Sequence, residues 1–291
     1  MRLDDFDPNS VNVEDQRGGR LPIGMKGGSI GCGTLVIALI GAVVFGIDPG
    51  QMIGGLEQVQ QQQQPAPGAG QAGTTASESC SVDAASREAC NALSSLNKTW
   101  QPIFQKSNVA FTPPKLVFYS QRGQSGCGSA QSAMGPFYCP SDNGIYIDTD
   151  FYREMDQRLG ASGDFARAYV IAHEYGHHVQ TVTGLSDQVR SAQSENPRGA
   201  NQLQVRMELQ ADCYAGVWAA RNKDRIEAGD IEEGLNAAHQ IGDDTLMKSA
   251  GRRPVEEAFT HGSSAQRMQW LRKGLESGNE DDCDTFADLR R

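Results

Sequence analysis

The chain has 291 residues, and its formal net charge at pH 7 is −10. This acidic balance, with a charged fraction of 21%, indicates an ordinary soluble surface and argues against nucleic acid as a partner. The residues beyond position 79 are numerous enough for one domain with a substantial core.

Residues 28–47 predict a transmembrane helix. The stretch GSIGCGTLVIALIGAVVFGI has 20 residues and no charged side chain, about the length that crosses a bilayer core of ~30 Å. No Lys or Arg occurs between Lys26 and Arg87, whereas four basic residues come earlier: Arg2, Arg17, Arg20 and Lys26. The positive-inside rule therefore places residues 1–27 in the cytoplasm. The chain beyond residue 47 is then expected outside the cell membrane, in the periplasm or the extracellular space.

A cleaved signal peptide is the competing interpretation of this segment. It is disfavoured because the leader before the apolar run has 26 residues and no clear A-x-A cleavage site follows the run. Cys32 does not fit a lipoprotein cysteine, since its apolar region follows it. A buried helix of a soluble domain is disfavoured by the many glycines.

Residues 48–79 predict a flexible linker. They are rich in Gln, Gly, Pro, Ala and Ser, and they include a run of glutamines at 60–64. Such a composition offers too little apolar area to offset the entropy of ordering the chain. Residues 80–291 are therefore predicted to form the folded domain.

Six cysteines lie in this domain, and an even number beyond a translocated span favours disulfides in an oxidising compartment. Short separations favour two of the pairs, and the third pair takes what remains: Cys80 with Cys90, Cys127 with Cys139, and Cys213 with Cys283. A cysteine metal site is the alternative, but the chain has no CxxC pair to support it.

The domain is predicted to be α+β, with a small sheet packed on an active-site helix. KLVFYS (115–120) and GIYID (144–148) read as strands, and most of the chain after Phe151 reads as helix.

His173, Glu174 and His177 form an HExxH motif near the end of one predicted helix. Positions four apart stand above one another on a helix, so the two imidazoles can share a metal ion with Glu174 beside them. The helix is predicted from an apolar stripe, from a cap at Ser162 or Asp164, and from a stop at Gly184; the stripe is Phe165, Tyr169, Ala172, Gly176 and Val179. Two core histidines bound to carbonyls are the alternative interpretation.

A catalytic zinc site usually takes three protein ligands, and Glu208 is predicted to be the third. It lies with Asp212 on one face of a second predicted helix, residues 203–222. Asp212 is expected to accept the free ring N–H of a zinc histidine, with His173 as the first choice. The alternative is that this acidic pair meets solvent or Arg206.

The strings AYVIAHEYGHHVQ, ELQADCYAGVWA and GPFYCPSDNGIYID closely resemble the bacterial neutral zinc metallopeptidase family of the YpfJ type. HExxH followed by ExxxD is also similar to the gluzincins. The resemblance runs from about residue 80 to the C-terminus and includes a similar N-terminal membrane segment. It implies a zincin-like domain, a Zn²⁺ cofactor and a membrane-anchored peptidase, but little about the substrate. In zincins an edge strand above the active-site helix pairs with an extended peptide, a role that residues 144–148 or a neighbouring strand would take here.

These features predict hydrolysis of a peptide or protein substrate. Zinc lowers the pKa of its bound water toward ~7, and Glu174 would take the proton and deliver it to the leaving amine. His261, in FTHGSSAQR, is the candidate donor to the oxyanion, because gluzincins with a similar TH…R segment place a histidine nearby. His239 is the second choice, and His178 points off the metal face and is given no role. The competing functions are an inactive, zinc-stabilised binding module on the membrane and a zinc hydrolase of cell-wall amide bonds.

Overall fold

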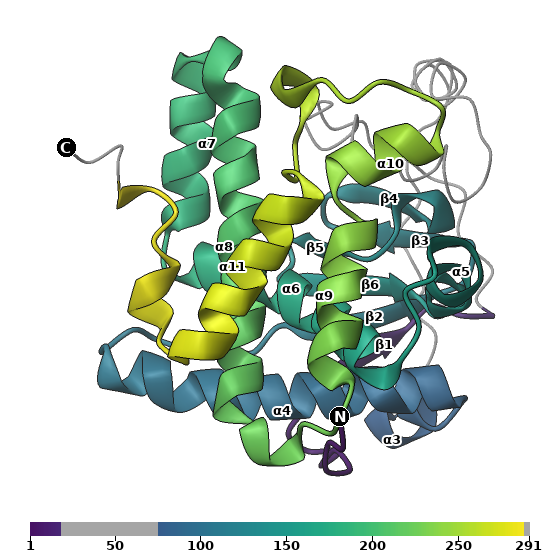
Figure 1. The fold of residues 1–291 in the computed structure, drawn as a ribbon. Helices are drawn as coiled ribbons and strands as arrows, with labels where there is room; N and C mark the ends of the chain where they lie inside the picture. Colours follow the sequence, from purple (N-terminus) through teal and green to yellow (C-terminus); the bar gives the residue numbers. More distant parts are fainter. Residues whose placement is uncertain (19–74, 288–291) are drawn as a thin grey trace, which may run out of the picture.

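A four-stranded sheet and one central helix organise the fold (Figure 1). The computed structural model describes residues 1–18 and 75–287. The strand order is β1 (Asn12–Asp15), β2 (Lys115–Tyr119), β6 (Gly144–Asp148) and β5 (Phe137–Cys139). The first three strands are parallel, and β5 runs antiparallel to β6. A separate hairpin joins β3 (Arg122–Ser125) to β4 (Gly128–Gln131).

Both predicted strands, β2 and β6, are confirmed as the central pair of the sheet. Their side chains alternate between two apolar clusters, because successive residues of a strand point to opposite faces. Leu116 and Ile145 belong to the main core, whereas Val117 and Tyr146 pack in a smaller cluster with Cys139. β6 is an interior strand, so the edge next to it is β5.

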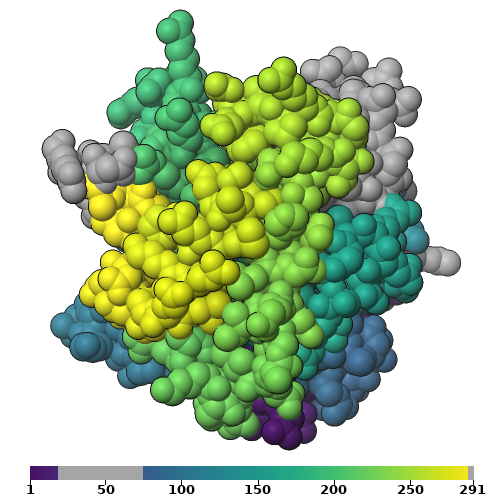
Figure 2. Space-filling view, viewed as in Figure 1, coloured from purple at the N-terminus to yellow at the C-terminus, as the bar shows by residue number. Residues whose placement is uncertain are grey.

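The rest of the described chain is mostly helical. The α-helices are α3 (Ala76–Cys80), α4 (Ala84–Lys106), α5 (Asp150–Leu159), α6 (Asp164–Val182), α7 (Leu185–Glu195), α8 (Ala200–Arg221), α9 (Asp230–Gln240), α10 (Asp243–Ser249) and α11 (Ser264–Ser277). Short 3₁₀ turns are η1 (Ser132–Met134), η2 (Pro197–Gly199), η3 (Lys223–Arg225), η4 (Glu256–Ala258) and η5 (Glu280–Cys283). The C-terminal third of the chain covers the middle of the face seen in Figure 2.

The central helix, α6, packs against α4, α8 and α9. All five residues of its predicted apolar stripe are buried. Gly176 sets the distance to α8, since a Cβ there would lie 2.8 Å from the Cα of Ala211. This close approach allows side chains of α6 and α8 to meet.

The predicted end of α6 is correct at its C-terminus and wrong at its N-terminus. Gly184 follows the helix with φ 76°, as a C-terminal stop requires. The predicted cap at Ser162 or Asp164 is wrong, because Gly163 holds the N-cap position and no side chain caps the helix. The carboxylate of Asp164 instead accepts a hydrogen bond of 2.6 Å from the α-ammonium group of Met1.

Residues 1–18 pack on the domain, whereas the positive-inside rule predicts that a membrane separates residues 1–27 from it. Strand β1 pairs with β2 in the register Val13 to Leu116. A single membrane crossing at residues 28–47 would put these two strands on opposite sides, so one molecule cannot contain both features at once.

The predicted membrane helix, including Cys32, and the linker up to residue 74 lie outside the described residues. Within the described ranges, no helix is both long and apolar enough to cross a membrane. The linker was predicted to end at residue 79, but α3 already begins at Ala76. Its start is stabilised by a capping box between Thr75 and Glu78.

All three predicted disulfides are confirmed: Cys80–Cys90, Cys127–Cys139 and Cys213–Cys283. The third ties α8 to the segment that follows α11.

Candidate metal centre

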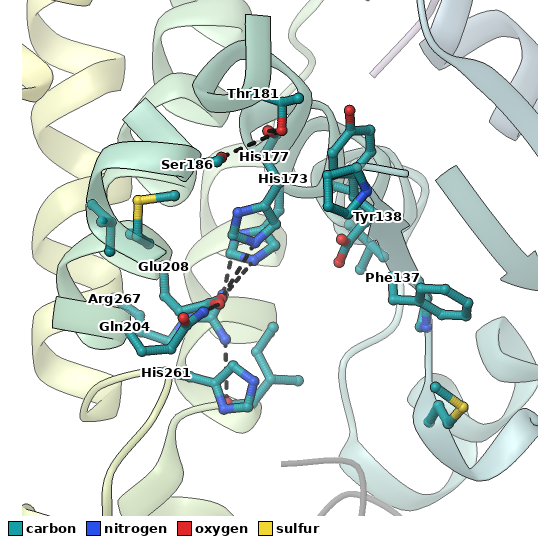
Figure 3. Close-up of a pocket in the computed structure, with 18 of the residues that line it drawn as sticks. Phe137, Tyr138, His173, His177, Thr181, Ser186, Gln204, Glu208, His261 and Arg267 are labelled. Carbon is teal, nitrogen blue, oxygen red and sulfur yellow. Dashed lines mark hydrogen bonds and ion pairs between the residues drawn. The ribbon is translucent and has the colours of Figure 1, made fainter. Parts of the chain in front are cut away.

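Three side chains from α6 and α8 converge at the centre of the domain (Figure 3). The Nε2 atoms of His173 and His177 lie 3.1 Å and 3.5 Å from Oε2 of Glu208. Ligand atoms bound tetrahedrally to zinc at ~2.0–2.1 Å are about 3.3 Å apart, so this arrangement fits one zinc ion. Among the described residues no further His, Cys, Asp or Glu joins this group. The donor set therefore leaves a coordination position for water, as a catalytic site requires.

His173 is held by an ion pair on its other side. Its Nδ1 lies 2.7 Å from Oδ1 of Asp212, as predicted. Arg267, on α11, binds both oxygens of this carboxylate at 2.9 Å, and Tyr169 donates to Oδ1 at 2.6 Å. Asp212 and Arg267 are almost completely buried. The carboxylate therefore has an acceptor role toward His173 and a counter-charge behind it.

The electrostatics of the site favour a cation between these groups. Burial raises the pKa of Asp212, but Arg267 and His173 lower it, to about 2 overall. Burial lowers the pKa of His173, but Asp212 and Glu208 raise it, to about 10 overall. Burial also opposes ionisation of Glu208, yet the two imidazoles hold its pKa well below the usual range. Two buried carboxylates thus flank His173, and together they favour positive charge at this position.

His177 has a neutral partner. Its Nδ1 lies 2.9 Å from Oε1 of Gln180, one turn further along α6. Gln204 donates from Nε2 to the second oxygen of Glu208 at 2.8 Å. All three candidate ligands are therefore oriented by hydrogen bonds.

Glu174 lines the same cavity, which has a volume of about 340 Å³. Burial raises the pKa of its carboxyl group, and His173 and His177 act in the opposite direction. No hydrogen bond from the described part of the chain holds this carboxylate. It remains available to a molecule in the cavity.

The structure places His261 in the cavity and leaves His239 out of it. His261 donates its backbone N–H to Oδ2 of Asp243 at 2.7 Å, and its Nδ1 lies 3.0 Å from Oδ1. The same Oδ2 accepts the backbone N–H groups of Thr260 and Gly262. Asp243 thus fixes both the loop and the ring. His239 lies in the last turn of α9 and is not one of the residues that line the cavity.

His178 has a structural role. It is completely buried, and its Nε2 donates to the carbonyl of Thr112 at 2.8 Å. Its Nδ1 lies 3.1 Å from the hydroxyl of Tyr138 on β5. Burial lowers the pKa of His178 to about 4, so the ring is neutral. It therefore ties the edge strand to α6.

The two walls of the cavity differ. Phe137 and Tyr138 of β5 lie across from the histidines in Figure 3, and apolar residues close to them in the chain also line the cavity: Met134, Pro136 and Pro140. The helices supply most of the polar lining residues, together with the apolar Val170, Val189 and Met207. The cavity joins a metal site to a mostly apolar surface.

Several of these residues were missed in the sequence analysis. Arg267 stands at the end of the quoted segment FTHGSSAQR, six residues after His261, which was a usable signal. Gln180 follows His177 by three and shares its helix face. Asp243 offers no local signal, because only the tertiary fold brings it to His261.

Comparisons with known proteins place the chain in a family. The sequence model of the family described as "Putative neutral zinc metallopeptidase" matches residues 4–286. The chain is 44% identical over 293 residues to the Escherichia coli (strain K12) protein named "Uncharacterized protein YpfJ", covering 96% of each chain. It is 40% identical over 206 residues to the Mycobacterium tuberculosis (strain H37Rv) protein named "Uncharacterized protein Rv2575", covering 66% of this chain and 68% of that one. No solved structure matches the chain significantly.

Proposed function

The chain belongs to the neutral zinc metallopeptidase family, and we propose that it is an active peptidase that hydrolyses peptide bonds with Glu174 as the general base. One observation carries this proposal. The three candidate ligands meet at 3.1 and 3.5 Å, and the carboxylate of Glu174 lies in the same cavity. A site that served only for folding would need neither the open position nor this carboxylate.

Bound zinc would lower the pKa of a coordinated water toward ~7 and polarise the scissile carbonyl. Glu174 then accepts the proton of the attacking water and passes it to the leaving amine. The raised pKa of its carboxyl group suits both steps. His261, fixed by Asp243, donates from Nε2 to the oxyanion.

Strand β5 supports a peptide as the substrate. Among the described residues it pairs with β6 alone, and its Phe137 and Tyr138 line the cavity. An extended peptide could add to its other edge through backbone hydrogen bonds. Pro136 and Pro140 flank the strand and lack N–H groups, so the pairing would be confined to about three residues.

The test is cleavage of an unbiased peptide library by the full chain in detergent, with Glu174→Gln as the variant and Glu276→Gln as its control. Glu276 is exposed on α11, so the control makes the same chemical change away from the cavity. We expect Glu174→Gln to retain zinc and to lose ~10²–10⁴-fold in kcat. Cleavage by Glu174→Gln at the wild-type rate would reject the mechanism.

The same assay separates the alternatives. Wild-type protein that holds zinc and cleaves nothing would favour the inactive binding module. Cleavage confined to cell-wall cross-linking peptides would favour the amide hydrolase of the cell wall.

We also propose that the domain lies outside the cytoplasmic membrane, attached through residues 28–47. Three disulfides support an oxidising compartment. The position of residues 1–18 can be tested with Asn9→Cys, because Asn9 is exposed in the turn before β1. Labelling by a membrane-impermeant maleimide in spheroplasts would place this segment with the domain. Labelling only after lysis would support a single crossing with a cytoplasmic N-terminus.

A further inference from the structure

Hydrogen bonds fix the orientation of the Gln180 amide beside His177. The side chain is fully buried, and its Nε2 lies 2.8 Å from the carbonyl of Met207 and 3.0 Å from Oε1 of Gln210. Both of these partners can only accept, so the nitrogen must face them and the oxygen must face His177. The Nδ1 of His177 therefore carries the hydrogen, and its Nε2 keeps the lone pair on the side of Glu208.

Gln210 is oriented in turn by the backbone of the C-terminal segment. Its Nε2 donates to the carbonyl of Cys283 at 3.1 Å, and the side chain is buried. A backbone carbonyl cannot donate, so this contact cannot be reversed. The hydrogen bonds from His177 through Gln180 and Gln210 thus run in one direction and end at Cys283.

Cys283 is held against α8 by covalent and polar contacts. Its disulfide partner, Cys213, lies one turn after Gln210 on α8. Two residues further on, Thr285 donates from Oγ1 to the carbonyl of Arg206 at 2.8 Å, and its own carbonyl accepts from Nη1 of Arg206 at 2.5 Å. In Figure 1 this segment follows α11 and runs beside α8 toward α7.

We propose that Gln210 is a positioning residue for the metal centre: through Gln180 it fixes the ring and the tautomer of His177, and the Cys213–Cys283 disulfide keeps the carbonyl that orients it in place. This inference rests on the proposed function, because it takes His177 to be a zinc ligand. It links the redox state of a disulfide near the C-terminus to the affinity of the site for zinc.

The experiment measures zinc affinity of the full chain by competition with a chromophoric chelator, and the visible spectrum of the Co²⁺-substituted protein. Gln210→Met removes the amide, and Cys213→Ser with Cys283→Ser removes the disulfide. Removal of Cys80 and Cys90, as the same double Ser variant, is the matched control, because that disulfide joins α3 to α4 and neither cysteine lines the cavity. We expect a loss of about 10-fold in zinc affinity for Gln210→Met and a changed cobalt spectrum, with wild-type behaviour in the control.

Combining the two changes tests whether they act along the same path. If the disulfide acts through Gln210, its removal from Gln210→Met should lower the affinity no further. If the fold-losses of zinc affinity in the two variants instead multiply in the combined variant, the proposed role of the disulfide is wrong. Wild-type affinity and spectrum in Gln210→Met would overturn the whole inference.

A second measurement avoids variants that fold poorly. Mild reduction of wild-type protein should speed zinc release to the chelator, and the same treatment should have no effect on the protein without Cys213 and Cys283. Equal release before and after verified reduction of this bond would contradict the proposal. Failure of wild-type protein to bind any zinc would instead reject the proposed function.

Discussion

The two sides of the metal centre hold their histidines by different chemistry. On the side of α11, His173 faces Asp212, whose charge is balanced by Arg267 at 2.9 Å. On the side of the C-terminal segment, His177 faces the neutral amide of Gln180, and Gln210 lies behind it. Both arrangements turn Nε2 of the histidine toward Glu208.

The two kinds of contact differ in the free energy that the fold loses when one partner is removed. A buried ion pair that loses one member leaves a charge without compensation, at a cost of about 3–5 kcal/mol. A neutral hydrogen bond that loses one member leaves an unsatisfied group, at a cost of about 1–3 kcal/mol. The ionic side should therefore dominate the stability of the domain, whereas the neutral side can adjust the site with less risk to the fold.

The largest predicted effect is that of Arg267→Met. It should lower the free energy of unfolding of the metal-free protein by about 3–5 kcal/mol, because the carboxylate of Asp212 has no access to solvent. Gln180→Met should cost about 1–3 kcal/mol. Urea unfolding in the presence of chelator, followed by tryptophan fluorescence, measures both.

A double variant sharpens this comparison. Asp212→Leu combined with Arg267→Met leaves no unpaired charge, so it should be more stable than Arg267→Met alone. If Arg267→Met and Gln180→Met lose the same free energy of unfolding, the ionic and the neutral side do not differ in their contribution to stability.

Glu208 belongs to both sides, since its Oε2 lies near both imidazoles. Glu208→Ala should therefore lower zinc affinity by more than the ~10–100-fold typical of a residue that only orients a ligand. His239→Ala is the control and should bind zinc as the wild type does. Full zinc occupancy of Glu208→Ala at limiting metal would show that it is not a ligand.

The sequence indicated the ligands but not what holds them. HExxH on a helix predicts His173, Glu174 and His177 because the helical repeat puts positions four apart on one face. The partners Arg267 and Asp243 come from other elements, and no periodicity relates them to the histidines that they contact. Strand β1 shows the same limit for the fold. Its four residues offer one apolar side chain, Val13, which packs against the main core, so no sequence period marks the strand; it forms because β2, about a hundred residues away, pairs with it.

Gln180→Glu would replace the neutral amide beside His177 with a carboxylate. This variant separates the effect on the orientation of the His177 ring from the effect on the stability of the fold. A glutamate still accepts the N–H of His177, but it has no hydrogen for Met207 or Gln210. We expect a larger loss of unfolding free energy than in Gln180→Leu, because a buried carboxylate oxygen then faces two acceptors, but a smaller loss of zinc affinity. Chelator competition compares the two variants. A Gln180→Glu protein that binds zinc as weakly as Gln180→Leu would show that orienting the ring does not matter.

His261 extends the comparison to a histidine outside the metal group, and Asp243→Asn is expected to have the smallest effect. Burial raises the pKa of Asp243, but His261 and the backbone N–H groups lower it overall, so the carboxylate is ionised. An imidazole that gives its Nδ1–H to this carboxylate can donate from Nε2 only when it carries a second proton. Donation to the oxyanion in wild-type protein therefore requires a ring that carries hydrogen on both nitrogens.

In Asp243→Asn the three backbone N–H groups should hold the amide oxygen, which leaves the amide nitrogen facing Nδ1 of His261. The neutral imidazole then carries its hydrogen on Nε2 and can donate from it. A neutral donor stabilises an oxyanion less than a charged one, so kcat should fall, by about 10-fold at most and less than the ~10²–10³-fold expected for His261→Ala. Steady-state kinetics on a verified peptide substrate measures both losses. An unchanged kcat in both Asp243→Asn and His261→Ala would mean that His261 is not the donor.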